Sequence, residues 1–178
     1  MKRKLLLTLA AIVATITAGA QTVTQGSLDF MADVHEMFIE CEFDQAIVYD
    51  RGNLPIAQWG VERDDECDEP TGTFMNNLAD VEVDIAHEMV EIASDKFKDI
   101  RFSSQRQHDY KLTCHLKEVN HKGQYADCDY IFTNTRTGQT LAVVSIKCKG
   151  GKFGTFVNLL GDSCRDSFKK LLKLLARK

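Results

Sequence analysis

The stretch "YKLTCHLKEVNHKGQYADCDYIFTNTRTGQTLAVVSIKC", residues 110–148, decides the fold. Apolar and polar residues alternate in three runs within it, which are residues 110–119, 125–134 and 140–148. Such alternation is typical of strands that bury one face. Gly123 and Gly138 lie in the two connections, where a glycine adopts positive φ at low cost. The stretch therefore predicts an antiparallel meander of three strands with one apolar face.

Two amphipathic helices are predicted, one on each side of this meander in the sequence. Apolar residues recur at steps of three and four over residues 73–97, and they recur in the same way over residues 157–175. Thr71 or Thr73 is expected to cap the first helix, and Thr155 is expected to cap the second. Each helix therefore has an apolar stripe that can cover the apolar face of the sheet.

The remaining segments complete the predicted fold. Residues 38–50 alternate as a further strand, and a short strand is predicted near residues 100–103. Residues 51–72 contain both prolines, so we expect a surface excursion with one helical turn near Trp59 and a solvated acidic loop at residues 64–69. The fold is predicted to be α+β, a two-layer sandwich in which two amphipathic helices cover one face of a mostly antiparallel sheet of four to five strands.

The first twenty residues, "MKRKLLLTLAAIVATITAGA", have the form of a secretory signal peptide. Cleavage is predicted after Ala20, which would leave a single domain over residues 21–178 in the periplasm or outside the cell. The signal peptide contains three basic residues and no acidic one, so its removal changes the net charge from −4 to −7. A chain this acidic is a poor partner for nucleic acid.

Six cysteines are an even number, which is compatible with disulfides in a secreted chain. Cys128 and Cys148 are predicted to lie on the same face of neighbouring strands, so they are candidates for a disulfide. Most of the cysteines also occupy positions where a small apolar side chain suits a core. Buried free thiols are therefore the alternative.

The glycine-rich turn "KCKGGKFGTF", residues 147–156, is the segment that most resembles a ligand loop. It lacks the residue order of a Walker loop, and it follows an antiparallel strand rather than a parallel crossover. The simpler interpretation is a corner between sheet and helix. The alternative is a site for a small phosphate-like anion. The residues of that alternative site are Lys149, Gly150, Gly151, Lys152, Gly154 and Thr155.

The sequence contains no arrangement that predicts catalysis. Cys114 and His115 are neighbours on a predicted strand, so their side chains point to opposite faces. His87 shares a helix face with two acidic residues, but one helix supplies only one such cluster of metal ligands. We therefore expect no catalytic residue, no metal ion and no cofactor. The basic C-terminal helix is expected to be a core helix, with contact to a membrane surface as the alternative.

Three segments carry a family resemblance, and they are "EFDQAIVYD" (residues 42–50), "YKLTCHLKEV" and "TGQTLAVVSIKCKGGKFGTFVNLLGD" (residues 137–162). With the Lys- and Leu-rich C-terminal helix, they resemble a group of small secreted domains of unknown function from Bacteroidetes. The order of elements is more distantly similar to the periplasmic domain of outer-membrane lipoproteins that activate peptidoglycan synthases or build the curli secretion pore. The resemblance implies a non-enzymatic envelope module that contacts an unknown protein or envelope component. We expect it to bind through a sheet edge or the acidic loop.

Overall fold

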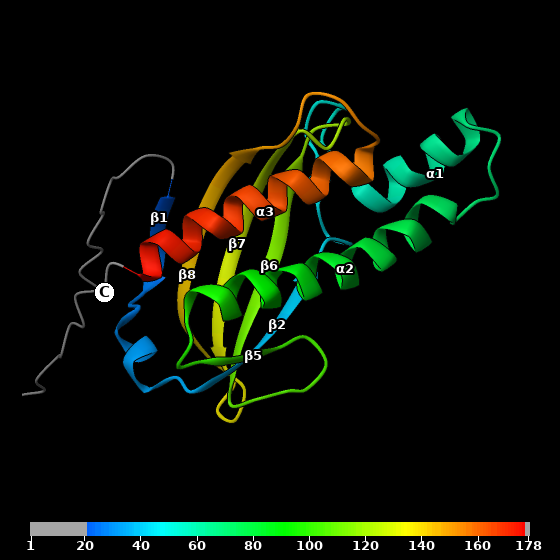
Figure 1. Cartoon of the computed structure of the whole chain (residues 1–178). Coiled ribbons are helices and arrows are strands. Elements are labelled where there is room, and N and C mark those ends of the chain that lie inside the picture. Colours follow the sequence, from blue (N-terminus) through cyan, green and yellow to red (C-terminus); the bar gives the residue numbers. More distant parts are fainter. Residues whose placement is uncertain (1–20, 177–178) are drawn as a thin grey trace, which may run out of the picture.

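Eight strands form one mixed sheet in the computed structural model, which describes residues 21–176 (Figure 1). The elements in chain order are β1 (Gln21–Gly26), the 3-10 helix η1 (Asp29–Asp33), β2 (Glu36–Glu42), β3 (Ile47–Val48), β4 (Leu54–Pro55), α1 (Ile56–Glu66), α2 (Thr73–Lys96), β5 (Arg101–Ser103), β6 (Tyr110–Val119), β7 (Tyr125–Asn134), β8 (Gln139–Lys149) and α3 (Phe156–Leu175). The predicted signal peptide lies outside the described residues.

The strand order confirms the α+β class and the meander, corrects the size of the sheet and adds parallel pairings. The main path is β1-β8-β7-β6-β2-β5, and β3 pairs with both β4 and β6. The meander β6-β7-β8 is antiparallel, whereas β2 runs parallel to both β5 and β6. The predicted four to five strands were therefore too few, and the sheet is mixed, with four of its seven strand pairings antiparallel. The sheet gains β1 at the edge beside β8, and α2 provides the crossover that makes β2 and β5 parallel.

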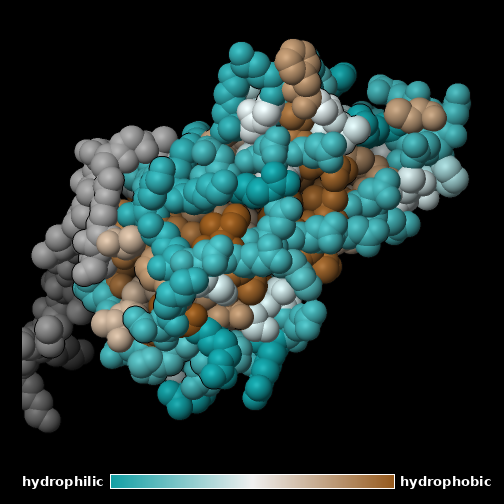
Figure 2. Space-filling view, viewed as in Figure 1, coloured by the Kyte–Doolittle hydropathy of each residue, from teal (hydrophilic) through white to brown (hydrophobic). Residues whose placement is uncertain are grey.

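The face of the sheet toward the helices forms the core, as the alternation predicted. Apart from the half-buried Tyr110, the alternating residues of the meander on this face are buried, and they are Leu112, Cys114, Leu116, Ala126, Cys128, Tyr130, Phe132, Ala142, Val144, Ile146 and Cys148. The helices α2 and α3 lie side by side across this face (Figure 1). Apolar side chains remain visible between them on the surface (Figure 2). The predicted arrangement of two amphipathic helices on one face is therefore confirmed.

The opposite face of the sheet carries charged side chains in pairs. Lys111 lies 2.6 Å from Glu40, and Lys117 lies 3.2 Å from Asp129 on the neighbouring strand. These pairs join adjacent strands, and their residues alternate along each strand with the buried residues, so their side chains lie on the opposite face. This face therefore has the polar character that antiparallel sheets show toward water.

A third helix, α1, replaces the predicted surface excursion. It is 11 residues long and begins directly after Pro55, so the expectation of a single helical turn was wrong. Its Trp59 is 5% exposed and packs edge-on against Phe74 of α2, with 5.1 Å between ring centroids. Proline suits the start of a helix, because the missing N–H has no intrahelical partner there. The two prolines and the acidic run concealed this helix in the sequence.

The N-terminus of α2 is capped by α1 and not by a threonine. Its N-cap residue is Gly72, and no side chain of the expected Thr71 or Thr73 accepts the first amides. Instead Asp64, which is 3% exposed, accepts hydrogen bonds from the amides of Phe74 (2.9 Å) and Gly72 (2.8 Å). The expected solvated acidic loop is therefore wrong at its first residue, which is a buried helix cap.

The C-terminal helix α3 starts as predicted, and its apolar stripe faces the sheet. Thr155 accepts a hydrogen bond from the amide of Asn158, which confirms the predicted cap. Leu160 and Phe168 are fully buried, whereas Lys169 and Lys173 are exposed. Contact of α3 with a membrane surface would thus involve its lysines and not its apolar stripe. Within the part of the chain that the structure describes, no helix is long and apolar enough to cross a membrane.

Candidate functional site

Three loops meet at one end of the sheet, and we call residues 48–54, 119–125 and 149–155 the loop end (Figure 1). Asp50 fastens the first loop to the second, because its carboxylate accepts from the amide of His121 (2.7 Å) and lies 2.6 Å from that histidine's Nδ1. Burial opposes ionisation of Asp50, but the bonds from His121 outweigh it and lower the pKa of Asp50.

The second and third loops are fastened by Gln124. Its backbone oxygen accepts from the amide of Gly150 at 2.7 Å, and its side-chain amide donates to the backbone oxygen of Lys152 at 3.1 Å. The loop end is therefore one connected surface, in which loops distant in the sequence hold one another in place.

The glycines of the predicted anion site allow this turn to cross closely over α3. A Cβ atom on Gly150 would lie 2.5 Å from the backbone oxygen of Leu159, and one on Gly151 would lie 2.8 Å from a carboxylate oxygen of Asp162. The first contact is with backbone, so only glycine fits at position 150, whereas the carboxylate near Gly151 can move aside. This geometry gives Gly150 a packing role.

The six residues of the predicted anion site do not gather around one point. Lys152, Gly154 and Thr155 line a common hollow at the start of α3. Lys149 lies elsewhere, because its ammonium group is placed over the ring of Tyr125 at 5.0 Å from the centroid. The two outer lysines therefore point to different parts of the loop end.

We call the hollow at the start of α3 the basic hollow, and it has a volume of about 420 Å³. Its lining residues are Arg63, His121, Lys122, Gln124, Lys152, Phe153, Gly154, Thr155, Phe156 and Leu159. Within residues 21–176, no carboxylate forms an ion pair with Arg63, Lys122 or Lys152. The N-terminal end of α3 adds the positive end of its dipole. This part of an acidic chain is therefore locally basic.

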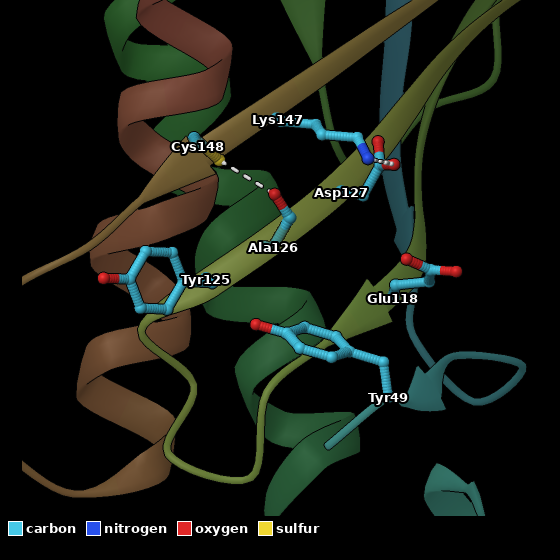
Figure 3. A pocket seen from close by; sticks show the side chains of 7 residues that line it. All are labelled: Tyr49, Glu118, Tyr125, Ala126, Asp127, Lys147 and Cys148. Carbon is cyan, nitrogen blue, oxygen red and sulfur yellow. Dashed lines mark hydrogen bonds and ion pairs between the residues drawn. The ribbon is translucent and has the colours of Figure 1, made fainter. Parts of the chain in front are cut away.

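A second hollow, the tyrosine pocket, lies beside the β6–β7 turn (Figure 3). It has a volume of about 280 Å³, and its lining residues are Tyr49, Glu118, Tyr125, Ala126, Asp127, Lys147 and Cys148. Lys147 and Asp127 form an ion pair of 3.5 Å at its side. Burial, and then the charge of Asp50, raise the pKa of Tyr49, so its phenol stays protonated and can donate a hydrogen bond at neutral pH.

Exposed aromatic rings distinguish the loop end from the rest of the surface. Phe153 is 93% exposed, and Tyr49 and Tyr125 are each 41% exposed. Only two other large apolar side chains in the described part of the chain have comparable exposure, Val61 on α1 and Val83 on α2. Aromatic and arginine side chains are enriched in the cores of protein interfaces. The aromatic rings and unpaired cations of the loop end together have the composition of a binding surface.

Five of the six cysteines lie in or beside the core, and one of them, Cys148, also lines the tyrosine pocket. The predicted pair does not lie directly opposite in the ladder, since Cys128 pairs with Ile146 and Cys148 pairs with Ala126. Both are free thiols in this structure, as are the other four cysteines, and the disulfide between Cys128 and Cys148 stays a prediction. Instead, the sulfur atoms of Cys114, Cys128 and Cys164 all lie within 4.8 Å of one another.

Sequence reasoning found the glycine-rich turn but missed most of the loop end. Tyr49 lies just beyond the end of β3 and Phe153 lies between glycines, so neither belongs to a periodic pattern, and Tyr125 begins β7 at a position out of phase with the buried residues. Arg63, which lines the basic hollow from α1, was missed because α1 was not predicted. The sequence could have indicated this surface through the isolated phenylalanine in "GGKFG", because a large apolar side chain in a glycine-rich turn is not part of an apolar stripe that packs into the core.

Comparisons with known proteins give likenesses of fold. No protein-family model matches the sequence, so none identifies the expected small secreted family, and no curated protein matches it. The chain is similar to a PelC dodecamer subunit from Paraburkholderia phytofirmans, with 10% identity, a TM-score of 0.42 and coverage of 86% of this chain and 96% of that one.

Two further solved structures show a similar degree of likeness. A PelC point variant from the same organism has 14% identity and a TM-score of 0.39, with coverage of 54% of this chain and 74% of that one. An uncharacterized protein has 14% identity and a TM-score of 0.40, with coverage of 53% of this chain. This chain spans 66% of the length of that protein.

Proposed function

We propose that this protein is a non-enzymatic binding module of the bacterial cell envelope and that its loop end holds a protein partner with acidic side chains. The observation that carries the proposal is the gathering of exposed aromatic rings and unpaired cations at this one end. Phe153 is the central anchor, because it is almost fully exposed beside Lys152. An apolar ring with cations around it suits a partner surface that combines an apolar pocket with carboxylates.

The lack of catalytic arrangements among the described residues supports a binding role. The ring nitrogens of His108, His115 and His121 contact the carboxylates of Glu36, Glu42 and Asp50, respectively. In residues 21–176, no histidine ring is hydrogen-bonded to a serine, threonine or cysteine side chain, which nucleophilic catalysis of the Ser–His or Cys–His type requires. Three of the five histidines therefore have partners that fit structural ion pairs.

The test is crosslinking in the native envelope with three forms of the full chain. The loop-end variant carries Phe153→Ser and Lys152→Glu, and the control variant carries Val83→Ser on α2, where the native side chain is 58% exposed. We expect the same protein adduct from the wild type and the Val83 variant, and loss of that adduct from the loop-end variant. Equal capture by all three forms would show that the loop end is not the interface.

The same variants separate a protein partner from the other ligands considered. If the loop-end variant loses binding to anionic vesicles and no protein adduct depends on Phe153, the surface contacts lipid and the proposal is wrong. If phosphate shifts the NMR signals of Lys152 to Thr155 at millimolar concentration and no protein adduct forms, the turn is a small-anion site instead. Both measurements require folded protein, so circular dichroism must show that each variant is folded.

A further inference from the structure

Three buried thiols converge in the core below α3, and this cluster is independent of the loop end. Cys114 comes from β6, Cys128 from β7 and Cys164 from α3, and each is at most 1% exposed. Their sulfur atoms all lie within 4.8 Å of one another. Cys41 of β2 pairs with Cys114 of β6. Cys148 of β8 pairs with Ala126 of β7, which lies two residues before Cys128 on the same face. Such convergence exceeds what a single buried cysteine, acting as a small apolar residue, requires.

The spacing suits an ion with three sulfur ligands. An atom at the centre of a triangle with 4.8 Å edges lies about 2.8 Å from each corner, and a metal–thiolate bond is about 2.3 Å. Each sulfur would therefore move inward by about 0.5 Å for an ion in the plane of the sulfurs and by up to about 1 Å for a pyramidal ion, which side-chain rotations of roughly 30° allow. A tetrahedral zinc site would need a fourth ligand, whereas the convergent set has three members.

The balance of charge between the three thiolates and the ion determines which thiophilic ion the apolar core favours. Buried apolar residues surround the cluster, among them Leu116, Phe132 and Phe168, each 0% exposed. Among the described residues, the buried polar set contains no lysine, arginine or histidine that could balance thiolate charge. Three thiolates around a monovalent or divalent ion would leave net negative charge in this apolar site, which is costly. Three thiolates around a trivalent ion are neutral.

We propose that Cys114, Cys128 and Cys164 form a binding site for a trivalent thiophilic ion, for which arsenic(III) is the chemical probe. Arsenous acid, As(OH)₃, is neutral and reacts with three thiols to give a tris-thiolate arsenic centre and three water molecules. Three S–H and three As–O bonds break, while three As–S and three O–H bonds form. No electron is transferred, so the step needs neither an oxidant nor a reductant.

Access to the site requires α3 to separate briefly from the sheet. Tyr130 of β7 is hydrogen-bonded to Ser167 and to the backbone oxygen of Cys164, so the same segment of α3 that carries the third thiol is fastened to the sheet. Capture of the ion would therefore be slow in the native state and fast during folding. The bound ion would link two strands to the helix, and it would stabilise the fold because it binds only the native arrangement.

The test compares arsenic uptake by the reduced full chain and by two alanine variants. The protein is refolded with sodium arsenite, freed of excess reagent and weighed by native mass spectrometry. The site variant is Cys164→Ala, and the matched control is Cys67→Ala, which removes the exposed cysteine. We expect one arsenic atom, with loss of three protons, in the wild type and in the Cys67 variant, with a rise in Tm of several degrees. We expect no uptake by the Cys164 variant.

X-ray absorption at the arsenic edge keeps the proposal testable if the Cys164 variant fails to fold. Three sulfur neighbours and no oxygen neighbour on the wild-type protein are expected. Two sulfurs with one oxygen, or no arsenic after refolding, would overturn the proposal. Equal uptake by the folded Cys164 variant would overturn it as well. Parallel samples with zinc chloride and with copper(I) complete the test, because stoichiometric binding of either ion without arsenic binding would refute the charge argument.

Discussion

Replacement of Asp64 by alanine tests whether the buried carboxylate is the cap that starts α2. The carboxylate accepts from the amides of Gly72 at 2.8 Å and of Phe74 at 2.9 Å. A capping bond is worth about 0.5–2 kcal/mol, and an amide left unsatisfied in a buried position costs about 1–3 kcal/mol. Water can enter part of the space that the carboxylate leaves. We therefore expect the free energy of unfolding to fall by about 2–4 kcal/mol.

Urea and thermal unfolding followed by circular dichroism measure this effect. For a domain of this size, each kcal/mol lowers Tm by about 2–4 °C, so Asp64→Ala should lower it by about 5–15 °C. Asp65→Ala is the control, because Asp65 is the exposed neighbour on the same helix, and we expect a change within about 0.5 kcal/mol. Asp64→Asn keeps one acceptor and should lie between the two. If Asp64→Ala and Asp65→Ala have equal stability, the cap does not exist as described.

Three further predictions concern other parts of the protein. Gly123→Ala should destabilise the protein by about 3 kcal/mol or more in urea unfolding, because φ is +77° and the new Cβ would lie 2.4 Å from a backbone oxygen of α3. Gly138→Ala is the control, since its φ is +70° and the space around it is open, and it should cost about 1 kcal/mol. Burial, and then the nearby acidic residues, raise the pKa of Glu82, so the wild type loses stability as pH rises through that pKa. Glu82→Gln should therefore have the higher Tm at pH 7, and its advantage should vanish below the usual pKa of glutamate. Thiol titration of the unreduced mature protein after denaturation separates the predicted disulfide from free thiols, because a count of four or fewer would establish a disulfide. A count of six, which is the state in this structure, would refute it, and Cys67 should react fastest before denaturation.

The layers of the fold could be predicted because they follow from periodicity. The meander strands and the α2 stripe each extend over ten residues or more, so alternation and helical spacing stand out from chance. The strand β1 has six residues, and Val23 is its single apolar side chain, so no alternation marks it in the sequence. Pairing with β8 stabilises it. Parallel pairing of β2 with β5 and β6 depends on the path of α2, which no local pattern encodes.

The candidate sites were less visible because they depend on tertiary proximity. The sequence placed Cys114 and Cys128 on the apolar faces of two strands and Cys164 on the apolar stripe of a helix. Their convergence depends on the strand register and on where α3 crosses the sheet. The loop end was hidden for another reason. Exposed aromatic residues in short turns have no periodic neighbours, so they are recognised only when the structure shows that no core covers them.

The helix that the sequence concealed also links the stability of the fold to the loop end. Arg63 of α1 lines the basic hollow, and the next residue, Asp64, caps α2. One side of α1 therefore forms the buried cap, and the other side contributes to the binding surface. Loss of the cap should displace Arg63 and weaken capture of the partner. Gly138 lies in the β7–β8 turn, at the opposite end of the meander. Its alanine variant should cost stability without affecting capture, which separates a local effect of α1 on the hollow from a general effect of lower stability.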